Sequence, residues 1–304
     1  MSRVLVIGAS GFVGRRLVPA LLKENHTVVA ASRRSAVSIP GEVQQVPLDI
    51  TDPESFKGLP EGIDTIVHAA ADRPGSASAT AVRTAFLVNT LGTINVLAYA
   101  EALNIKRVVY CSTLSVYALP QAIPIAEEGR TYPVQAPDSY YGISKLAGES
   151  ICERFRQERR LTCLSLRLGR IYGPGEYAGS LVSNWVQTAR NREDIVVYGD
   201  GMRSLDFIYI DDAVRGIVNA VQARSEGGVI NMGSGVETSW GTLAEAIVEV
   251  FSPPQGASKV VYIPEGNRER CYLDISLART VLGFAPQFTL REGLLAWRNE
   301  RMAA

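Results

Sequence analysis

The sequence predicts an α/β fold in which helices cover a doubly wound parallel sheet, followed by a smaller, discontinuous C-terminal substrate-binding domain. Three observations predict it. Short apolar runs rich in branched residues alternate with segments whose apolar residues recur at helical spacing. A glycine-rich turn at residues 8–14 joins the first such run to a helical segment. Beyond residue 175 the alternation loosens, which is typical of a second, interrupted domain.

Six strands are expected at residues 3–7, 27–31, 43–47, 63–67, 107–111 and 161–168, with returns to the same sheet at 206–210 and 229–232. Helices are expected at 81–103, 138–160, 211–221, 238–251 and 290–301. This order predicts a dinucleotide-binding domain formed by residues 1–172 plus 206–233. Residues 173–205 plus 234–304 are expected to form the substrate domain.

Composition limits the classes of partner. Hydrophobic residues make up 46% of the 304 and charged residues 20%, as in soluble globular proteins. Lys plus Arg number 31, as do Asp plus Glu, so no net field favours nucleic acid or a membrane surface. No apolar run approaches the ~20 residues of a membrane span. Two histidines and four cysteines without CxxC spacing exclude a histidine-rich metal site, and no metal is expected. The composition predicts a cytoplasmic protein.

The glycine turn predicts a Rossmann-type dinucleotide site. Gly8, Gly11 and Gly14 are spaced three apart between a strand and a helix. Glycines let backbone amides approach a pyrophosphate, and the helix N-terminus adds free N–H groups and a positive dipole end. The cofactor contacts expected from this turn are Gly8, Ser10, Gly11, Phe12, Val13 and Gly14.

The end of the second strand bears on the choice of cofactor. An acid there would bind the ribose hydroxyls of NAD, whereas arginines accommodate the 2′-phosphate of NADP. This chain has Arg33 and Arg34 and no acid, so NADP(H) is favoured and NAD(H) stays possible. Asp49 at a strand end can accept a hydrogen bond from the adenine amino group. Further cofactor contacts are expected at strand ends, from Ile50, Ala69, Ala70 and Leu168.

Tyr141 and Lys145 are four residues apart in the helix expected at 138–160, so phenol and ammonium share one face. A phenol titrates near ~10, and a nearby cation favours the phenolate, which would bring proton transfer closer to neutral pH. Alone, such a pair is more often a core ring beside a solvated amine. His68, which closes a strand, is interpreted as structural.

These motifs together resemble a known family. Gly8-x-x-Gly11-x-x-Gly14, Asn89, Thr113 and Tyr141-x-x-x-Lys145 occur in the order typical of extended short-chain dehydrogenases/reductases. Residues 172–175, 199–201 and 206–212 extend the likeness to the nucleotide-sugar epimerase/dehydratase/ketoreductase branch. The resemblance implies that Tyr141 is the general acid/base, that Lys145 lowers its pKa and holds the nicotinamide ribose, and that Thr113 hydrogen-bonds the reacting oxygen. It also implies that Asn89 supports Lys145 and contacts the cofactor, and that the helices carrying Asn89 and Tyr141 form a homodimer.

Departures from the family pattern limit the reactions and the substrate contacts that are expected of this chain. The 4,6-dehydratases of this family carry an acid pair after the hydroxyl residue, where this chain has Leu114 and Ser115, so water elimination is not expected. Arg170 stands where the family often has asparagine, and Leu205 stands where it usually has an arginine. Cations for a substrate diphosphate are therefore expected at other positions: Arg170, Arg203, Arg268 and Arg270.

The leading interpretation is an NADP(H)-dependent oxidoreductase that interconverts a ketone and a secondary alcohol on a nucleotide-activated sugar, like a 4-ketoreductase. A nucleotide-sugar 4-epimerase with tightly bound NAD is the main alternative. A reductase of a non-sugar ketone is a third. A non-catalytic NAD(P)-binding module is the fourth, and the retention of Thr113, Tyr141 and Lys145 argues against it.

Overall fold

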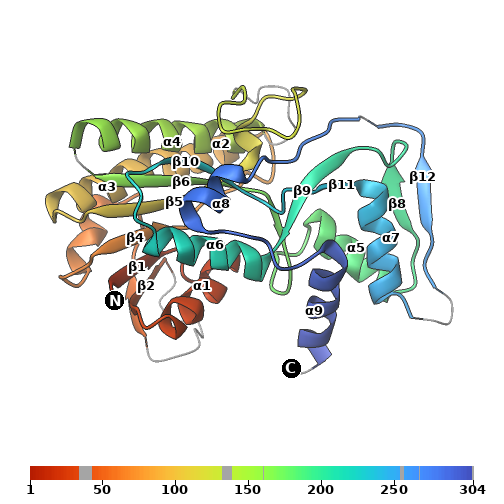
Figure 1. Cartoon of the computed structure of the whole chain (residues 1–304), viewed down its shortest axis with the longest axis horizontal. Helices are drawn as coiled ribbons and strands as arrows, with labels where there is room; N and C mark the ends of the chain where they lie inside the picture. The colour runs from red at the N-terminus through yellow and green to blue at the C-terminus, as the bar shows by residue number, and fades with distance from the viewer. Residues whose placement is uncertain (34–42, 132–138, 160, 254–256, 267, 303–304) are drawn as a thin grey trace.

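A seven-stranded parallel sheet forms the larger part of the molecule, with strand order β10-β6-β5-β4-β1-β2-β3 (Figure 1). The structure is a computed structural model that describes residues 1–33, 43–131, 139–159, 161–253, 257–266 and 268–302. The doubly wound α/β prediction is confirmed. The strands are β1 (Arg3–Ile7), β2 (Thr27–Ser32), β3 (Gln44–Pro47), β4 (Thr65–His68), β5 (Arg107–Thr113), β6 (Thr162–Leu168) and β10 (Gly228–Met232).

Helices cover both faces of this sheet, as Figure 1 shows. On one face α1 (Phe12–Lys23) packs beside α6 (Ile210–Gln222). On the other lie α2 (Ala79–Phe86), α3 (Gly92–Ala102) and the long α4 (Ser139–Arg159). Two short 3₁₀ helices, η1 (Pro53–Gly58) and η3 (Leu114–Val116), follow β3 and β5. The inner strands β1, β4 and β6 are therefore buried on both sides, which explains their apolar runs, whereas the edge strand β3 is mostly exposed.

The single helix expected at residues 81–103 is interrupted, and this prediction is corrected. A π-helical turn, η2 (Leu87–Leu91), separates α2 from α3. Asn89 lies in this turn and is fully buried. Its side-chain amide donates to the Asp72 carbonyl at 2.7 Å and to Ser144 Oγ at 2.9 Å, and it accepts from the Asp72 N–H at 2.8 Å. The widened turn thus connects the loop after β4 to α4.

A second unit follows β6 and lies beside the sheet (Figure 1). It contains a three-stranded sheet of order β11-β9-β7 and a two-stranded sheet of β12 and β8. Its elements are β7 (Arg170–Tyr172), α5 (Leu181–Arg190), β8 (Ile195–Tyr198), β9 (Ser204–Tyr209), β11 (Glu237–Ser239), α7 (Trp240–Phe251), β12 (Val260–Ile263) and α9 (Leu290–Met302), while α8 (Ser276–Leu282) packs near β10.

The expected return of residues 206–210 to the main sheet is wrong, because β9 belongs to the three-stranded sheet and β10 takes the place beside β6. The chain leaves β6 at Gly169, where a Cβ would lie 3.0 Å from the Asp206 carbonyl oxygen. The buried Asp206 carboxylate accepts backbone N–H groups from Ser234, Gly235 and Leu273. These bonds hold β9 against the segment after β10 rather than within the sheet.

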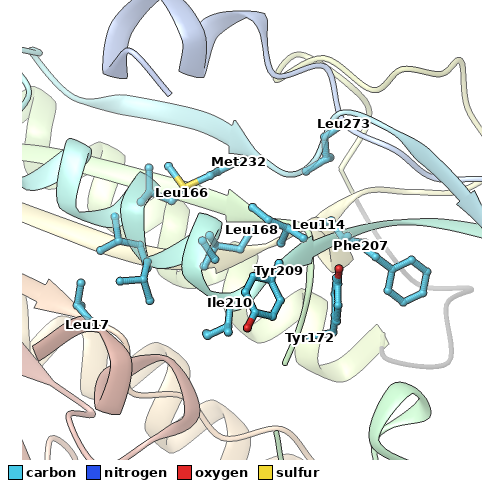
Figure 2. Close-up of a cluster of buried hydrophobic side chains, with 14 of the residues drawn as sticks. Leu17, Leu114, Leu166, Leu168, Tyr172, Phe207, Tyr209, Ile210, Met232 and Leu273 are labelled. Carbon is cyan, nitrogen blue, oxygen red and sulfur yellow. The ribbon is translucent and has the colours of Figure 1, made fainter. Parts of the chain in front are cut away.

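The core continues from the main sheet into the second unit. Figure 2 shows this cluster, in which Leu166 and Leu168 of β6 lie near aromatic side chains of the second unit. The Tyr172 and Tyr209 ring centroids are 5.6 Å apart, and Tyr209 lies 4.8 Å from the ring of Phe288. This shared apolar packing fixes the two units relative to each other and therefore shapes the space between them.

The helical stretch Ala79–Ala102 is long and apolar enough, by length and composition alone, to cross a membrane. Its mean hydropathy is 1.3 and 39% of it is buried. In the fold this stretch packs on α4 and on strands β4 and β5, as a helix that covers a sheet does. Part of its apolar surface nevertheless faces outward.

A buried ion pair joins α4 to the sheet. The Arg167 side chain on β6 contacts both carboxylate oxygens of Glu149, with Nη2 2.8 Å from Oε2, and the two side chains are 6% and 3% exposed. Ser112 Oγ on β5 donates to Glu149 Oε1 at 2.5 Å. Arg167 also lies 4.7 Å from the ring centroid of Tyr117 and donates to the Glu127 carbonyl. The network thus links α4, β5 and β6 near the carboxyl ends of the strands.

Removal of one partner should leave an uncompensated buried charge. We expect Glu149→Ala to lower the free energy of unfolding by about 3–5 kcal/mol, measured by urea denaturation. A matched control is Glu249→Ala, whose carboxylate forms an exposed pair with Arg291 and should contribute within about 0.5 kcal/mol. Equal effects of the two variants would contradict a special role for the buried pair.

Candidate active site

The glycine turn between β1 and α1 forms a tight cradle, as predicted. Gly8 has φ +89°, and a Cβ there would lie 2.6 Å from the Ala70 backbone nitrogen. A Cβ on Gly14 would lie 2.2 Å from the Gly8 carbonyl oxygen. Gly11 precedes α1 and supplies no side-chain cap to its N-terminus. The N–H groups of the first turn are thus available for a phosphate, which is what a dinucleotide pyrophosphate needs.

A cavity of about 600 Å³ opens beside this cradle. Its lining comes from the glycine turn, the loop after β4, the ends of β5 and β6, the start of α4, and elements of the second unit. Of the predicted residues, the lining includes Gly8, Gly11, Phe12, Val13, Gly14, Ala69, Thr113, Tyr141, Leu168, Arg170 and Arg203. The cavity therefore brings the expected cofactor turn, Thr113 and Tyr141 to one space.

Thr113 is held at the carboxyl end of β5, where parallel sheets place their chemistry. Its Oγ1 accepts the Ser115 N–H at 3.2 Å and caps the short helix η3. It also donates to Ser115 Oγ at 3.3 Å. Leu114 and Ser115 line the same wall, so no carboxylate stands directly after Thr113.

Lys145 is fully buried, and its ammonium lies 3.9 Å from the ring centroid of Tyr110. Among the residues that the structure describes, Nζ has no hydrogen-bond partner. Burial lowers the pKa of Lys145 to about 8, against smaller opposing effects of Cys111, Cys152 and Glu149. A desolvated ammonium without an acceptor fits the hydroxyls of a nicotinamide ribose, so the chain's own residues fit a dinucleotide.

His68 faces the same interior and does not compete for the proton. Its Nε2 lies 3.1 Å from Thr93 Oγ1, and the residue is fully buried. Burial, and to a lesser degree the charge of Lys145, lower its pKa to about 3. His68 is therefore neutral, in keeping with its interpretation as structural.

Asn89 is connected to Lys145 indirectly, through its hydrogen bond to the preceding residue, Ser144. Its amide is occupied by Asp72 and Ser144, and Ser144 directly precedes Lys145 on α4. The Ser144 carbonyl also accepts from Thr90 Oγ1 at 3.1 Å. Asn89 thus positions the start of α4, while its contact with the cofactor stays a prediction.

Asp49 and Arg33, the residues predicted to bind the adenosine half of the cofactor, do not line the cavity. The Asp49 carboxylate accepts from the Thr51 N–H at 2.9 Å and from Thr51 Oγ1 at 2.8 Å. The backbone bond from Thr51, helped by the charge of Arg33, lowers the pKa of Asp49. Arg33 is exposed, Ile50 is buried against Gly92, and Arg34 lies outside the described residues. The roles of these residues toward a cofactor stay predictions.

The four arginines predicted to hold a diphosphate divide into two pairs. Arg170 and Arg203 line the cavity, next to Glu176 and Glu269 respectively. The other two form ion pairs outside that lining: Arg268 with Asp200 and Arg270 with Glu237, with the arginine side chains 78% and 56% exposed.

Residues that the sequence reasoning missed also line the cavity. Arg73 lies 5.7 Å from the ring centroid of Tyr141, and it donates to the Tyr177 hydroxyl at 3.3 Å. Trp240 lies under Arg203, and Glu176 follows the Gly173–Gly175 segment directly. A signal existed for Arg73, which follows the end of β4 at the edge of the sheet that carries the glycine turn.

The fold and this site define a nucleotide-sugar enzyme of the extended short-chain dehydrogenase/reductase type. The chain belongs to the NAD dependent epimerase/dehydratase family, whose model matches residues 4–233. The resemblance inferred from the motifs is thereby confirmed.

Individual relatives cover nearly the whole chain. The UDP-glucose 4-epimerase of Mycolicibacterium smegmatis is 31% identical, over 96% of this chain and 96% of its own. The UDP-glucose 4-epimerase of Thermotoga maritima, solved with UDP-glucose, has a TM-score of 0.86 at 25% identity and covers 99% of both chains. MoeE5, solved with UDP-glucuronic acid and NAD, has a TM-score of 0.84 at 27% identity and covers 98% of this chain and 99% of its own. Decarboxylases and a dehydratase are also among the relatives.

The buried state of Lys145 predicts an effect on stability at alkaline pH. Its pKa is about 8 in the folded protein, below the ordinary 10.5, so the unfolded chain binds more protons between these values. The free energy of unfolding of the cofactor-free protein should therefore rise by about 3 kcal/mol across this window relative to Lys145→Met. Urea denaturation at several pH values measures the difference.

The exposed Lys57 offers a matched control, because Lys57→Met should leave the pH dependence of the wild-type protein unchanged. Parallel stability curves for the wild-type protein and Lys145→Met would rule out a depressed pKa for Lys145.

Proposed function

We propose that this chain is a nucleotide-sugar 4-epimerase that retains NAD(H) through the reaction. One observation carries the proposal: Thr113 and Tyr141 share a cavity with the dinucleotide turn, and no carboxylate follows Thr113. The 4,6-dehydratases of the family use an acid pair at that position. Relatives named as UDP-glucose 4-epimerases lend further support.

Thr113 and Tyr141, two of the groups that this chemistry needs, line the cavity. NAD held at the glycine turn would supply hydride chemistry at the carbinol carbon. Tyr141 takes the proton of the sugar hydroxyl and later returns one to the same oxygen. Thr113 donates a hydrogen bond to that oxygen, and the Lys145 ammonium favours the phenolate. Epimerisation would require the keto sugar to rotate and present its other face to the cofactor, and a cavity of about 600 Å³ leaves room for a sugar.

A second candidate is an NADP(H)-dependent 4-ketoreductase. The exposed Arg33 at the end of β2 favours it, because an arginine there suits a 2′-phosphate. A reductase exchanges its cofactor in each turnover, whereas an epimerase keeps it.

Incubation of the purified protein with UDP-glucose, UDP-galactose or UDP-glucuronic acid, followed by NMR of the sugar, tests the proposal. We expect interconversion of C4 epimers without added cofactor, and about one NAD per chain in an acid extract. Tyr141→Phe should lower kcat by roughly 10²–10⁴-fold. The control Tyr198→Phe alters an exposed ring on β8 and should retain full rate. Consumption of NADPH with a 4-keto sugar, and no epimer, would decide for the reductase.

We also propose a homodimer formed through α2, η2, α3 and α4, in a soluble, cytoplasmic enzyme. The stretch Ala79–Ala102 is apolar but 39% buried, and Leu91, Ile94 and Leu103 are large apolar side chains that are exposed there. A second copy of this face would cover them.

Charge on this face should separate the subunits. The double variant Leu91→Glu/Ile94→Glu is expected to be monomeric by light scattering after gel filtration, because paired carboxylates oppose desolvation at an interface. The control Leu277→Glu lies on α8, where the leucine is also exposed, and should leave the wild-type mass unchanged. A wild-type protein that is monomeric at high micromolar concentration would contradict the proposal.

A further inference from the structure

Two arginines of the cavity are each paired with an acid on the cavity wall. Arg170 Nη2 lies 3.3 Å from Glu176 Oε1, and Arg203 Nη2 lies 3.4 Å from Glu269 Oε2. All four residues line the cavity. The side chains of the first pair are 18% and 2% exposed, and those of the second are 22% and 23% exposed. Both pairs are therefore largely screened from water and matter electrostatically.

The two arginines lie at the edge of the three-stranded sheet of the second unit. β7 and β9 run parallel, with Arg170 opposite Phe207. Arg203 directly precedes β9, and it lines the cavity together with Leu205 and Phe207, the alternate residues of that strand. Thr113 and Tyr141 come from β5 and α4 instead. The arginines thus belong to the wall of the second unit, away from the elements that carry the reacting groups.

Neither pair has the geometry of a strong, bidentate ion pair. Charge-assisted bonds between guanidinium and carboxylate are usually about 2.7–2.9 Å long and often bidentate. Both contacts here are longer and run through one nitrogen of each arginine. Arg203 Nε is buried and has no hydrogen-bond partner among the described residues, and its guanidinium lies 4.4 Å from the Trp240 ring centroid. Each arginine retains donors for a second anion.

We propose that Glu176 and Glu269 limit the affinity for the nucleotide-sugar by competing with its diphosphate for Arg170 and Arg203. The inference rests on the proposed function, since it takes a nucleoside diphosphate as the ligand of this wall. A diphosphate displaces the carboxylates from the two guanidinium groups when it binds, and the carboxylates reclaim them when product leaves. Glu176 and Glu269 are then residues that set specificity and release, and they take no part in proton transfer.

The competition predicts the sign of two substitutions. Glu176→Gln and Glu269→Gln keep the volume of the side chain and remove its charge, so each should bind UDP more tightly than the wild-type protein does. We expect the Kd of UDP to fall by about 2- to 5-fold, the size of one weak ion pair. Arg170→Met and Arg203→Met should raise it. If the acids merely oriented the arginines, both glutamine variants would bind more weakly.

Isothermal titration with UDP measures these constants without turnover. Glu249→Gln, in the exposed pair with Arg291, is the matched control and should leave the Kd unchanged. Thermal unfolding shows that each variant is folded; should Glu176→Gln fail to fold, the more exposed Glu269→Gln decides. An unchanged or higher Kd in the folded glutamine variants overturns the inference, as does the absence of UDP binding in every variant. A protein that binds UDP but epimerises no sugar contradicts the proposed function alone.

Discussion

The ion pair between Arg167 and Glu149 is the interaction on which the site geometry depends. Glu149 lies one turn after Lys145 on α4, and its carboxylate also accepts from Ser112, the neighbour of Thr113. One buried acid therefore sets the distance between the helix that carries the phenol and the strand end that carries the hydroxyl. Such a pair costs desolvation, and it is stable here because Arg167 and Ser112 together satisfy both carboxylate oxygens.

The interior behind the reacting groups contains titratable side chains whose charged forms are disfavoured by burial. Lys145 is an ammonium against an aromatic face, and His68 beside it is kept neutral by burial. Lys145 opposes stability in the isolated chain, because a buried ammonium without an acceptor is costly in a low dielectric. Functional sites commonly violate the packing rules that the rest of a protein obeys, and two large hydrophobic clusters on the faces of the sheet offset the cost.

Local patterns predicted the parallel sheet and the glycine turn, and they placed Thr113 at the carboxyl end of a strand, where parallel sheets carry their chemistry. The joint role of Thr113 and Tyr141 was implied by the family resemblance. The place of β9 was not predictable in this way. Residues 206–210 were predicted as a buried strand, but a strand does not encode its partner. The choice of sheet follows from the Asp206 carboxylate and from Gly169, which are distant in sequence from the groups they contact. The same holds for the cavity wall. Arg170 and Arg203 were identified as cations, whereas their partners Glu176 and Glu269 became visible only through the fold.

The π-helical turn at Leu87–Leu91 gives this region an unusual sensitivity to chain length. A π-turn holds one more residue than an α-turn over nearly the same rotation about the helix axis, so loss of one residue within η2 would convert it to an ordinary helical turn and leave α3 close to its present orientation. The widened turn from which Asn89 reaches Ser144 would be lost. A one-residue deletion here, unlike one in a surface loop, would therefore alter the buried contact beside Lys145 while the apolar side chains of α3 kept their direction. Sequence drift in this stretch is therefore expected to proceed by substitution at constant length.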